Sequence, residues 1–124
     1  MGTWEVDLQL IQPWLDELDG ETAAPVWDAL EVLQDIGPKL GRPLVDSVKR
    51  SAFKNMKELR PPSPGRSEIR ILFAFDPKRR AIMLLAGDKS VGGTRERWNR
   101  WYARAIPRAD RLFRRYLEEM EDSK

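Results

Sequence analysis

The sequence predicts a single α+β domain over residues 1–124, with a small antiparallel β-sheet packed by two N-terminal helices and followed by C-terminal helices. Three observations predict it. The length of 124 residues suits one domain with one modest core. Apolar residues recur at helical spacing over residues 11–33 and again after residue 94. Between residues 53 and 86 the pattern changes to the alternation and short apolar runs of strands.

The N-terminal third reads as a short strand followed by two helices. Residues 4–8 alternate apolar and acidic side chains, which predicts a half-buried strand at a sheet edge. Apolar residues at helical spacing over residues 11–18 predict a first helix of about two turns. Residues 26–33 form the apolar face of a second helix, with Pro25 in its first turn. The Gly- and Pro-rich residues 37–43 then form a connector.

Three consecutive strands are expected in the middle of the chain. Residues 53–60 form the first, which the prolines that follow bring to an end. Residues 67–75 form the second, whose alternation places Arg70 on the face opposite Ile69, Ile71 and Phe73. Residues 81–86 are almost continuously apolar, as expected for a strand covered on both faces. Short connections make these strands an antiparallel meander.

The C-terminal region is expected to be helical from a cap at Thr94. Trp98, Trp101 and Tyr102 follow one another at i, i+3 and i+4, which favours core packing over a base-stacking platform. Pro107 is expected to kink this helix or to start a new one.

Composition excludes several kinds of chemistry. The chain has no His and no Cys, so imidazole general bases, thiolate nucleophiles, disulfides and Cys or His metal sites are absent. Catalysis would have to use Lys, Arg, Tyr, Asp, Glu or the backbone. The N-terminus lacks a signal-peptide pattern, and no apolar run approaches the roughly 18 residues of a membrane span. We expect a soluble cytoplasmic protein without a membrane partner.

The formal net charge of +2 conceals a strong segregation of charge. Residues 1–48 contain 10 acidic and 2 basic side chains, whereas residues 49–115 contain 19 basic and 6 acidic ones. Such asymmetry indicates a surface for a polyanion, because Lys and Arg contacts to phosphate supply most non-specific nucleic-acid affinity. The alternative is that the acidic and basic segments pair with each other on folding.

Arg70 is the sharpest candidate among the basic residues of the predicted sheet, because its neighbours in the strand are apolar and a covered guanidinium needs a partner. It forms either a salt bridge to Glu58 or Glu68, or a clamp on a phosphate group. The other basic residues near it in the predicted sheet are Lys54, Lys57, Arg60, Arg66 and Lys89.

The arginines of the C-terminal region have two interpretations. They form either a solvated helix face or a surface on which a phosphate backbone lies. The RNA-binding candidates of the chain are Arg66, Arg95, Arg97, Arg100 and Arg104.

Residues 55–60, 67–75 and 81–85 together resemble the strand core of RelE/HigB-type toxins, and most closely the HigB-like branch that includes phage-derived Gp49-like relatives. The resemblance spans roughly residues 4–102. It implies a metal-independent mRNA endonuclease that acts on the ribosome, needs no cofactor and is held inactive by a cognate helix-turn-helix antitoxin. The reaction would be attack of a ribose 2′-hydroxyl on the adjacent phosphate.

Position by position, the resemblance assigns Arg70 to the scissile phosphate and Arg60 to a second, often basic position. It implies that Lys57 or Lys54 acts on the attacking hydroxyl, and that Lys89 or Tyr102 assists the leaving group, with Tyr116 as a second aromatic candidate. Several HigB-type toxins use His, which this chain lacks. A mechanism based on Lys and Arg is therefore expected.

Three other functions stay open. A toxin fold without nuclease activity would block a topoisomerase, as ParE-like relatives do, or act as a nucleic-acid-binding or antitoxin-pairing module. A degenerate phage-derived remnant would only pair with its antitoxin.

Overall fold

The computed structural model describes residues 4–62, 68–89 and 95–123. Within them the chain forms five strands, three α-helices and a short 3₁₀ turn at Gly37–Lys39. The elements follow in the order β1 (Glu5–Asp7), α1 (Gln12–Asp16), α2 (Gly20–Ile36), β2 (Val45–Ser47), β3 (Lys57–Leu59), β4 (Ile69–Phe75), β5 (Arg80–Asp88) and α3 (Arg95–Asp122). The predicted α+β class is confirmed.

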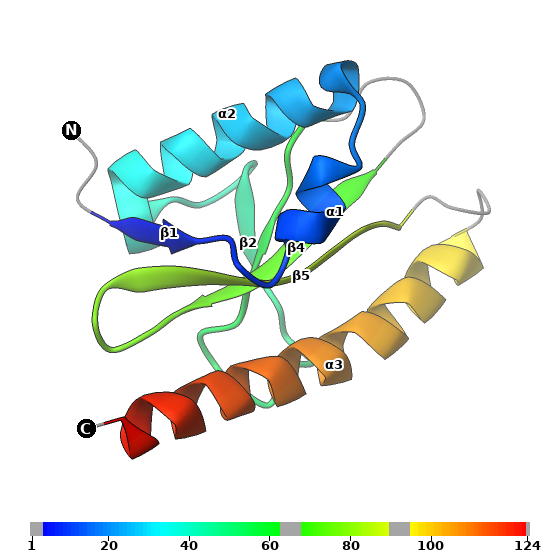
Figure 1. Ribbon diagram of the computed structural model, residues 1–124. Coiled ribbons are helices and arrows are strands. Elements are labelled where there is room, and N and C mark those ends of the chain that lie inside the picture. The colour runs from blue at the N-terminus through cyan, green and yellow to red at the C-terminus, as the bar shows by residue number, and fades with distance from the viewer. Residues whose placement is uncertain (1–3, 63–67, 90–94, 124) are drawn as a thin grey trace.

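The strands form one mixed sheet in the order β1-β5-β4-β3-β2 (Figure 1). The meander of β3, β4 and β5 is antiparallel, as the sequence predicts. Antiparallel β2 extends it at one edge, whereas β1 pairs with β5 in parallel at the other edge. The short edge strand expected near residues 4–8 is thus confirmed, and its parallel pairing makes the sheet mixed.

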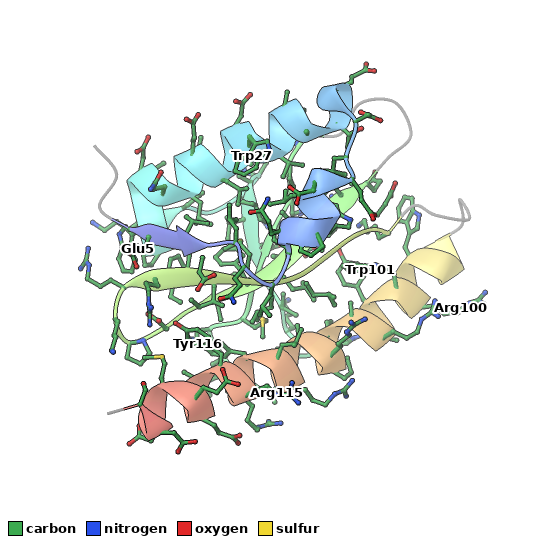
Figure 2. All side chains as sticks on the ribbon, viewed as in Figure 1. Glu5, Trp27, Arg100, Trp101, Arg115 and Tyr116 are labelled. Atoms are coloured by element: carbon green, nitrogen blue, oxygen red, sulfur yellow. The ribbon has the colours of Figure 1, made fainter. Side chains whose placement is uncertain are left out.

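The helices cover the two faces of this sheet (Figure 1). Helices α1 and α2 lie on one face and pack against alternate residues of β4, namely Ile69, Ile71 and Phe73. Helix α3 lies on the other face and packs against Leu72 and Ala74. Figure 2 shows Trp101 and Tyr116 directed from α3 towards the sheet. The alternation of β4 therefore places Arg70 beneath α3.

Two helix boundaries differ from the prediction. Helix α2 begins at Gly20, because the Asp19 side chain accepts a hydrogen bond from the Thr22 N–H at 2.7 Å and caps the helix; Pro25 consequently lies inside the helix. Helix α3 continues through Pro107, so of the two expected outcomes the start of a new helix there is wrong. Pro107 is exposed, and its neighbours Ala105, Ile106 and Ala109 remain buried against the sheet. Packing of that face outweighs the hydrogen bond that proline cannot donate.

The strand expected over residues 53–60 is also shorter in the structure, where β3 covers only Lys57–Leu59. The preceding loop is fastened to α3 instead, because the buried Asp110 carboxylate accepts hydrogen bonds from the Ser51 hydroxyl and from the Ala52 N–H, the latter at 2.9 Å. None of the helices in the described part of the chain has the length and hydrophobicity that crossing a bilayer requires.

Candidate functional site

Arg70 lies at the centre of a buried cluster of charged residues beneath α3. Its side chain is 8% exposed and forms ion pairs with Glu68 (Nη2 to Oε2, 2.9 Å) and with Glu58 (Nε to Oε1, 3.1 Å). Its Nη1 also donates to the Ile69 carbonyl at 2.8 Å. The salt bridge predicted from the sequence is therefore present with both carboxylates. The alternative, a clamp on a phosphate group, stays a prediction.

The sheet register explains why these groups meet. Glu58 on β3 is paired with Leu72 on β4, so it shares the α3 face with Arg70. On the other side of β4, Arg70 is paired with Gly87. A methyl group on Gly87 would lie 2.7 Å from the Trp101 indole nitrogen, so the glycine lets α3 approach the sheet closely there.

Tyr102 connects α3 to this cluster by donating its hydroxyl hydrogen bond to Glu58. Burial raises the pKa of Tyr102, and the adjacent Glu58 carboxylate raises it further, which outweighs the opposing effect of Arg70. The positive charge of Arg70 therefore does not make this phenol a stronger acid. Tyr102 stays protonated and acts as a hydrogen-bond donor.

Lys89 lies at the end of β5 beside the same aromatic residues. Its Nζ is 5.1 Å from the centroid of the Trp98 ring and 5.3 Å from that of Tyr102. Burial lowers the pKa of Lys89, and Arg70 lowers it further, against the opposing effect of the two nearby carboxylates. Arg60 also contributes to this lowering, and its Nη1 lies 3.8 Å from the Asp46 carboxylate at the margin of the cluster.

The structure does not bring the two candidate lysines to Arg70. Lys57 is paired with Phe73, so it projects from the opposite face of the sheet. Lys54 is exposed and lies in the loop before β3, where the next residue, Asn55, donates to the Phe75 carbonyl. Phe75 lies five residues from Arg70 along β4, a separation of roughly 16 Å in a strand.

The remaining candidates from the sequence lie on α3 or outside the described residues. Arg100 and Arg104 are exposed on α3, and Figure 2 shows Arg100 extending away from the sheet. Arg66 lies outside the described residues, as do the side chains of Arg95 and Arg97, whose backbone belongs to α3. Tyr116 is far along the helix and donates to Asp76 at 2.7 Å, which places it in a contact between α3 and the β4–β5 turn.

A cavity of about 190 Å³ opens beside the charged cluster and was not evident from the sequence. Glu58 and Tyr102 contribute to its lining from β3 and α3, and Lys49 and Arg50 contribute cations from the loop after β2. The remaining lining residues are Ser47, Val48, Asn99 and Ile106. A carboxylate, a phenol and flanking cations can together bind a phosphodiester and move a proton.

The sequence gives little indication that Lys49, Arg50 and Glu58 line a common cavity. Lys49 and Arg50 are adjacent basic residues in a turn, and Glu58 follows a lysine in a strand. Their convergence depends on the register of β2 and β3. The described residues contain no group of three or more acidic side chains placed to hold a metal ion.

Residues 13–114 match the model of the family described as phage-derived protein Gp49-like. The chain belongs to this family of HigB-like toxins. It is 54% identical over 121 residues to the protein named "Putative toxin HigB2" of Mycobacterium tuberculosis, and 46% identical over 110 residues to "Putative toxin HigB3" of the same organism. The resemblance found in the strand core is thereby confirmed.

The two relatives differ in how much of their length the chain matches. The alignment with HigB2 covers 98% of this chain and 58% of the relative, whereas that with HigB3 covers 89% and 90%. No solved structure matches the chain.

Proposed function

We propose that this protein is the toxin of a type II toxin–antitoxin system and that it cleaves mRNA on the ribosome. The kinship with proteins named as HigB toxins supports the toxin role. The observation that carries the nuclease activity is the buried Arg70 between Glu58 and Glu68, beside a cavity lined by Glu58, Tyr102 and two cations. This arrangement combines a proton acceptor with positive charge at one concave site.

In the proposed reaction the Glu58 carboxylate removes the proton from a ribose 2′-hydroxyl as its oxygen attacks the adjacent phosphorus. Arg70 stabilises the negative charge that develops on the phosphoryl oxygens. A guanidinium has five N–H groups. The Nη groups donate to Glu68 and to the Ile69 carbonyl, whereas the buried Nε–H makes no hydrogen bond within the described residues although Glu58 Oε1 lies 3.1 Å away. The proposed role of Arg70 therefore rests on its positive charge.

Lys89 is the proposed acid for the leaving group. Its ammonium transfers a proton to the 5′-oxygen as the P–O5′ bond breaks, which yields a 2′,3′-cyclic phosphate and a 5′-hydroxyl. Its lowered pKa makes this transfer easier than from an ordinary lysine. Tyr102, with its raised pKa, orients Glu58 instead. Glu58 thus replaces Lys57 and Lys54, which lie elsewhere, as the proposed base.

The proposed partners are the ribosome and its mRNA in the cytoplasm, and a cognate antitoxin. Exposed arginines of α3 would contact phosphate without reading sequence. Arg100 and Arg104 belong to this surface. Among the described residues, Arg60–Asp46 is the only ion pair that joins the acidic residues 1–48 to the basic residues 49–115. The charges of Arg100 and Arg104 are therefore not neutralised by the acidic segment.

The test is expression of wild type and variants in bacterial cells, with growth and the 5′ ends of transcripts as readouts. Glu58→Gln and Arg70→Lys should abolish most cleavage, whereas Lys57→Ala, on the other face, should cleave like wild type. Circular dichroism of each purified variant reports whether it is folded. If folded Arg70→Lys or folded Glu58→Gln cleaves transcripts as well as wild type does, the proposed site is wrong.

A second function deserves comparison because Arg70 is largely enclosed by carboxylates. A non-nucleolytic toxin would use the exposed arginines of α3 to bind nucleic acid or a topoisomerase, with the Arg70 cluster stabilising the fold. Growth arrest with intact transcripts and induced DNA-damage signalling would favour that function over message cleavage.

A further inference from the structure

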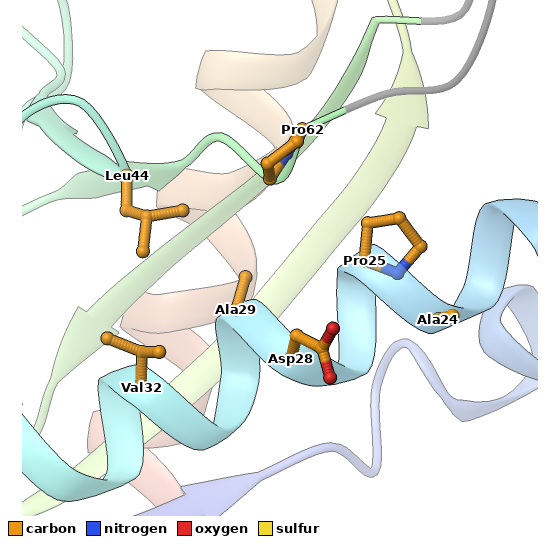
Figure 3. A pocket seen from close by; sticks show the side chains of 7 residues that line it. All are labelled: Ala24, Pro25, Asp28, Ala29, Val32, Leu44 and Pro62. Atoms are coloured by element: carbon orange, nitrogen blue, oxygen red, sulfur yellow. The ribbon is translucent and has the colours of Figure 1, made fainter.

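A groove on the side of the molecule away from α3 lies between α2 and the ends of β2 and β3. It has a volume of about 260 Å³ and is lined by apolar side chains apart from Asp28 (Figure 3). Pro25, Ala29 and Val32 form its α2 wall, and Leu44 and Pro62 lie opposite. It is smaller than the roughly 300–1,000 Å³ of typical small-molecule sites and offers few polar groups to orient a ligand.

Acidic side chains line the same helix along its outer side. Glu21, Asp28 and Asp35 recur at seven-residue intervals and, with Glu31, are all exposed. Within the described residues none of these four carboxylates takes part in an ion pair. The groove therefore combines an apolar floor with an unneutralised acidic rim, and Ile36, 46% exposed, extends the apolar surface at the end of α2.

This combination restricts what can bind there. The acidic rim repels RNA, which is drawn to the arginines on the opposite face. A second copy of this chain is a poor occupant, because its basic surface on α3 consists of exposed arginines: Arg100, Arg104, Arg108, Arg111, Arg114 and Arg115. The exposed apolar residues between these arginines are Ala103 and Pro107, which are too small to fill the groove.

We propose that this groove binds an amphipathic helix of a protein partner, with apolar residues at i, i+3 or i+4 and i+7 in the groove and Lys or Arg against Asp28, Glu31 and Asp35. Helix-in-groove binding of this kind uses a buried apolar stripe with a charged margin. The 17 residues of α2 give the partner helix about 25 Å, or four to five turns, to lie against. This proposal does not depend on the nuclease activity.

The probes are two fluorescent peptides of about 17 residues with the same leucine pattern, one with lysines and one with glutamates at the other positions, titrated into the full chain. We expect the lysine peptide to bind and the glutamate peptide not to bind. Amide hydrogen exchange with the lysine peptide bound should slow in α2 and near Leu44. Equal binding of both peptides, or slowing confined to α3, would overturn the proposal.

Matched charge reversals locate the contact. Asp28→Lys, an exposed position, should weaken the lysine peptide about tenfold or more, because a like charge then faces it. Glu118→Lys makes the same charge change at an exposed position of α3 and should leave binding within about twofold. Val32→Glu should also weaken binding by placing a carboxylate in the apolar floor. Equal losses in Asp28→Lys and Glu118→Lys would reduce the effect to net charge and refute the site.

Discussion

Removal of the Arg70 side chain should destabilise the protein far more than removal of the charge on Glu58. In Arg70→Met, the Tyr102 hydroxyl is the one hydrogen-bond partner that Glu58 keeps within the described residues, at a site where its side chain is 10% exposed. Loss of one member of a buried ion pair costs about 3–5 kcal/mol. In Glu58→Gln, by contrast, Arg70 retains Glu68 and the Ile69 carbonyl, so we expect a loss of about 1–3 kcal/mol.

Guanidinium chloride unfolding of the two variants and of the double variant measures these losses. With a slope on the order of 3 kcal/mol/M, the midpoint of Arg70→Met should fall by roughly 1–1.7 M. The double variant should lose less than the sum of the singles by at least about 1 kcal/mol, because each single leaves a charge without its partner. Losses that add to within about 0.5 kcal/mol would show that Arg70 and Glu58 are energetically independent, against the geometry.

Three further predictions concern other contacts. Gly87→Ala should cost about 1–3 kcal/mol by pressing a methyl group on Trp101, whereas Gly20→Ala, with open space around it, should not destabilise in thermal unfolding. Burial raises the pKa of Asp76, but hydrogen bonds from Tyr116 and Arg80 outweigh it and lower that pKa below its ordinary value of 3.8. The stability that Asp76→Asn removes in urea unfolding should therefore be full above about pH 5 and should decline as the pH falls below the ordinary value and through the lowered pKa. If Lys89 is the acid, cleavage should fall with rising pH below the ordinary lysine range of about 10.4, and Lys89→Arg should abolish that alkaline decline.

The parts of the fold that could be predicted are those set by local patterns. Alternation in β4 placed Arg70 opposite Ile69 and Ile71, and it does so in the structure. The three-residue β2 has no pattern of its own, because its pairing with β3 defines it. Lys54 was expected on a strand, but the contact of its loop with Asp110, more than fifty residues later, depends on tertiary packing.

In the candidate site, too, local patterns predict some features and tertiary packing decides the others. Arg70 and its carboxylate partners could be proposed from one strand and its neighbour, since buried guanidinium groups need acceptors. Whether Lys57 or Glu58 faces α3 depends on a one-residue difference in strand register, which flips every side chain to the other face. The cavity beside Glu58 requires α3 to be placed over the sheet, and the sequence of α3 indicates only that one side of it is apolar.

The parallel pairing of β1 with β5 has a consequence for handling the protein. Strand β5 runs for nine residues and is mostly apolar, yet in the described part of the chain only the three residues of β1 pair with its outer edge. A long uncovered apolar edge invites pairing with other chains. Shortening the N-terminus past Asp7 would therefore favour sheet extension between molecules, so solubility during expression depends on a segment that lies apart from the charged cluster.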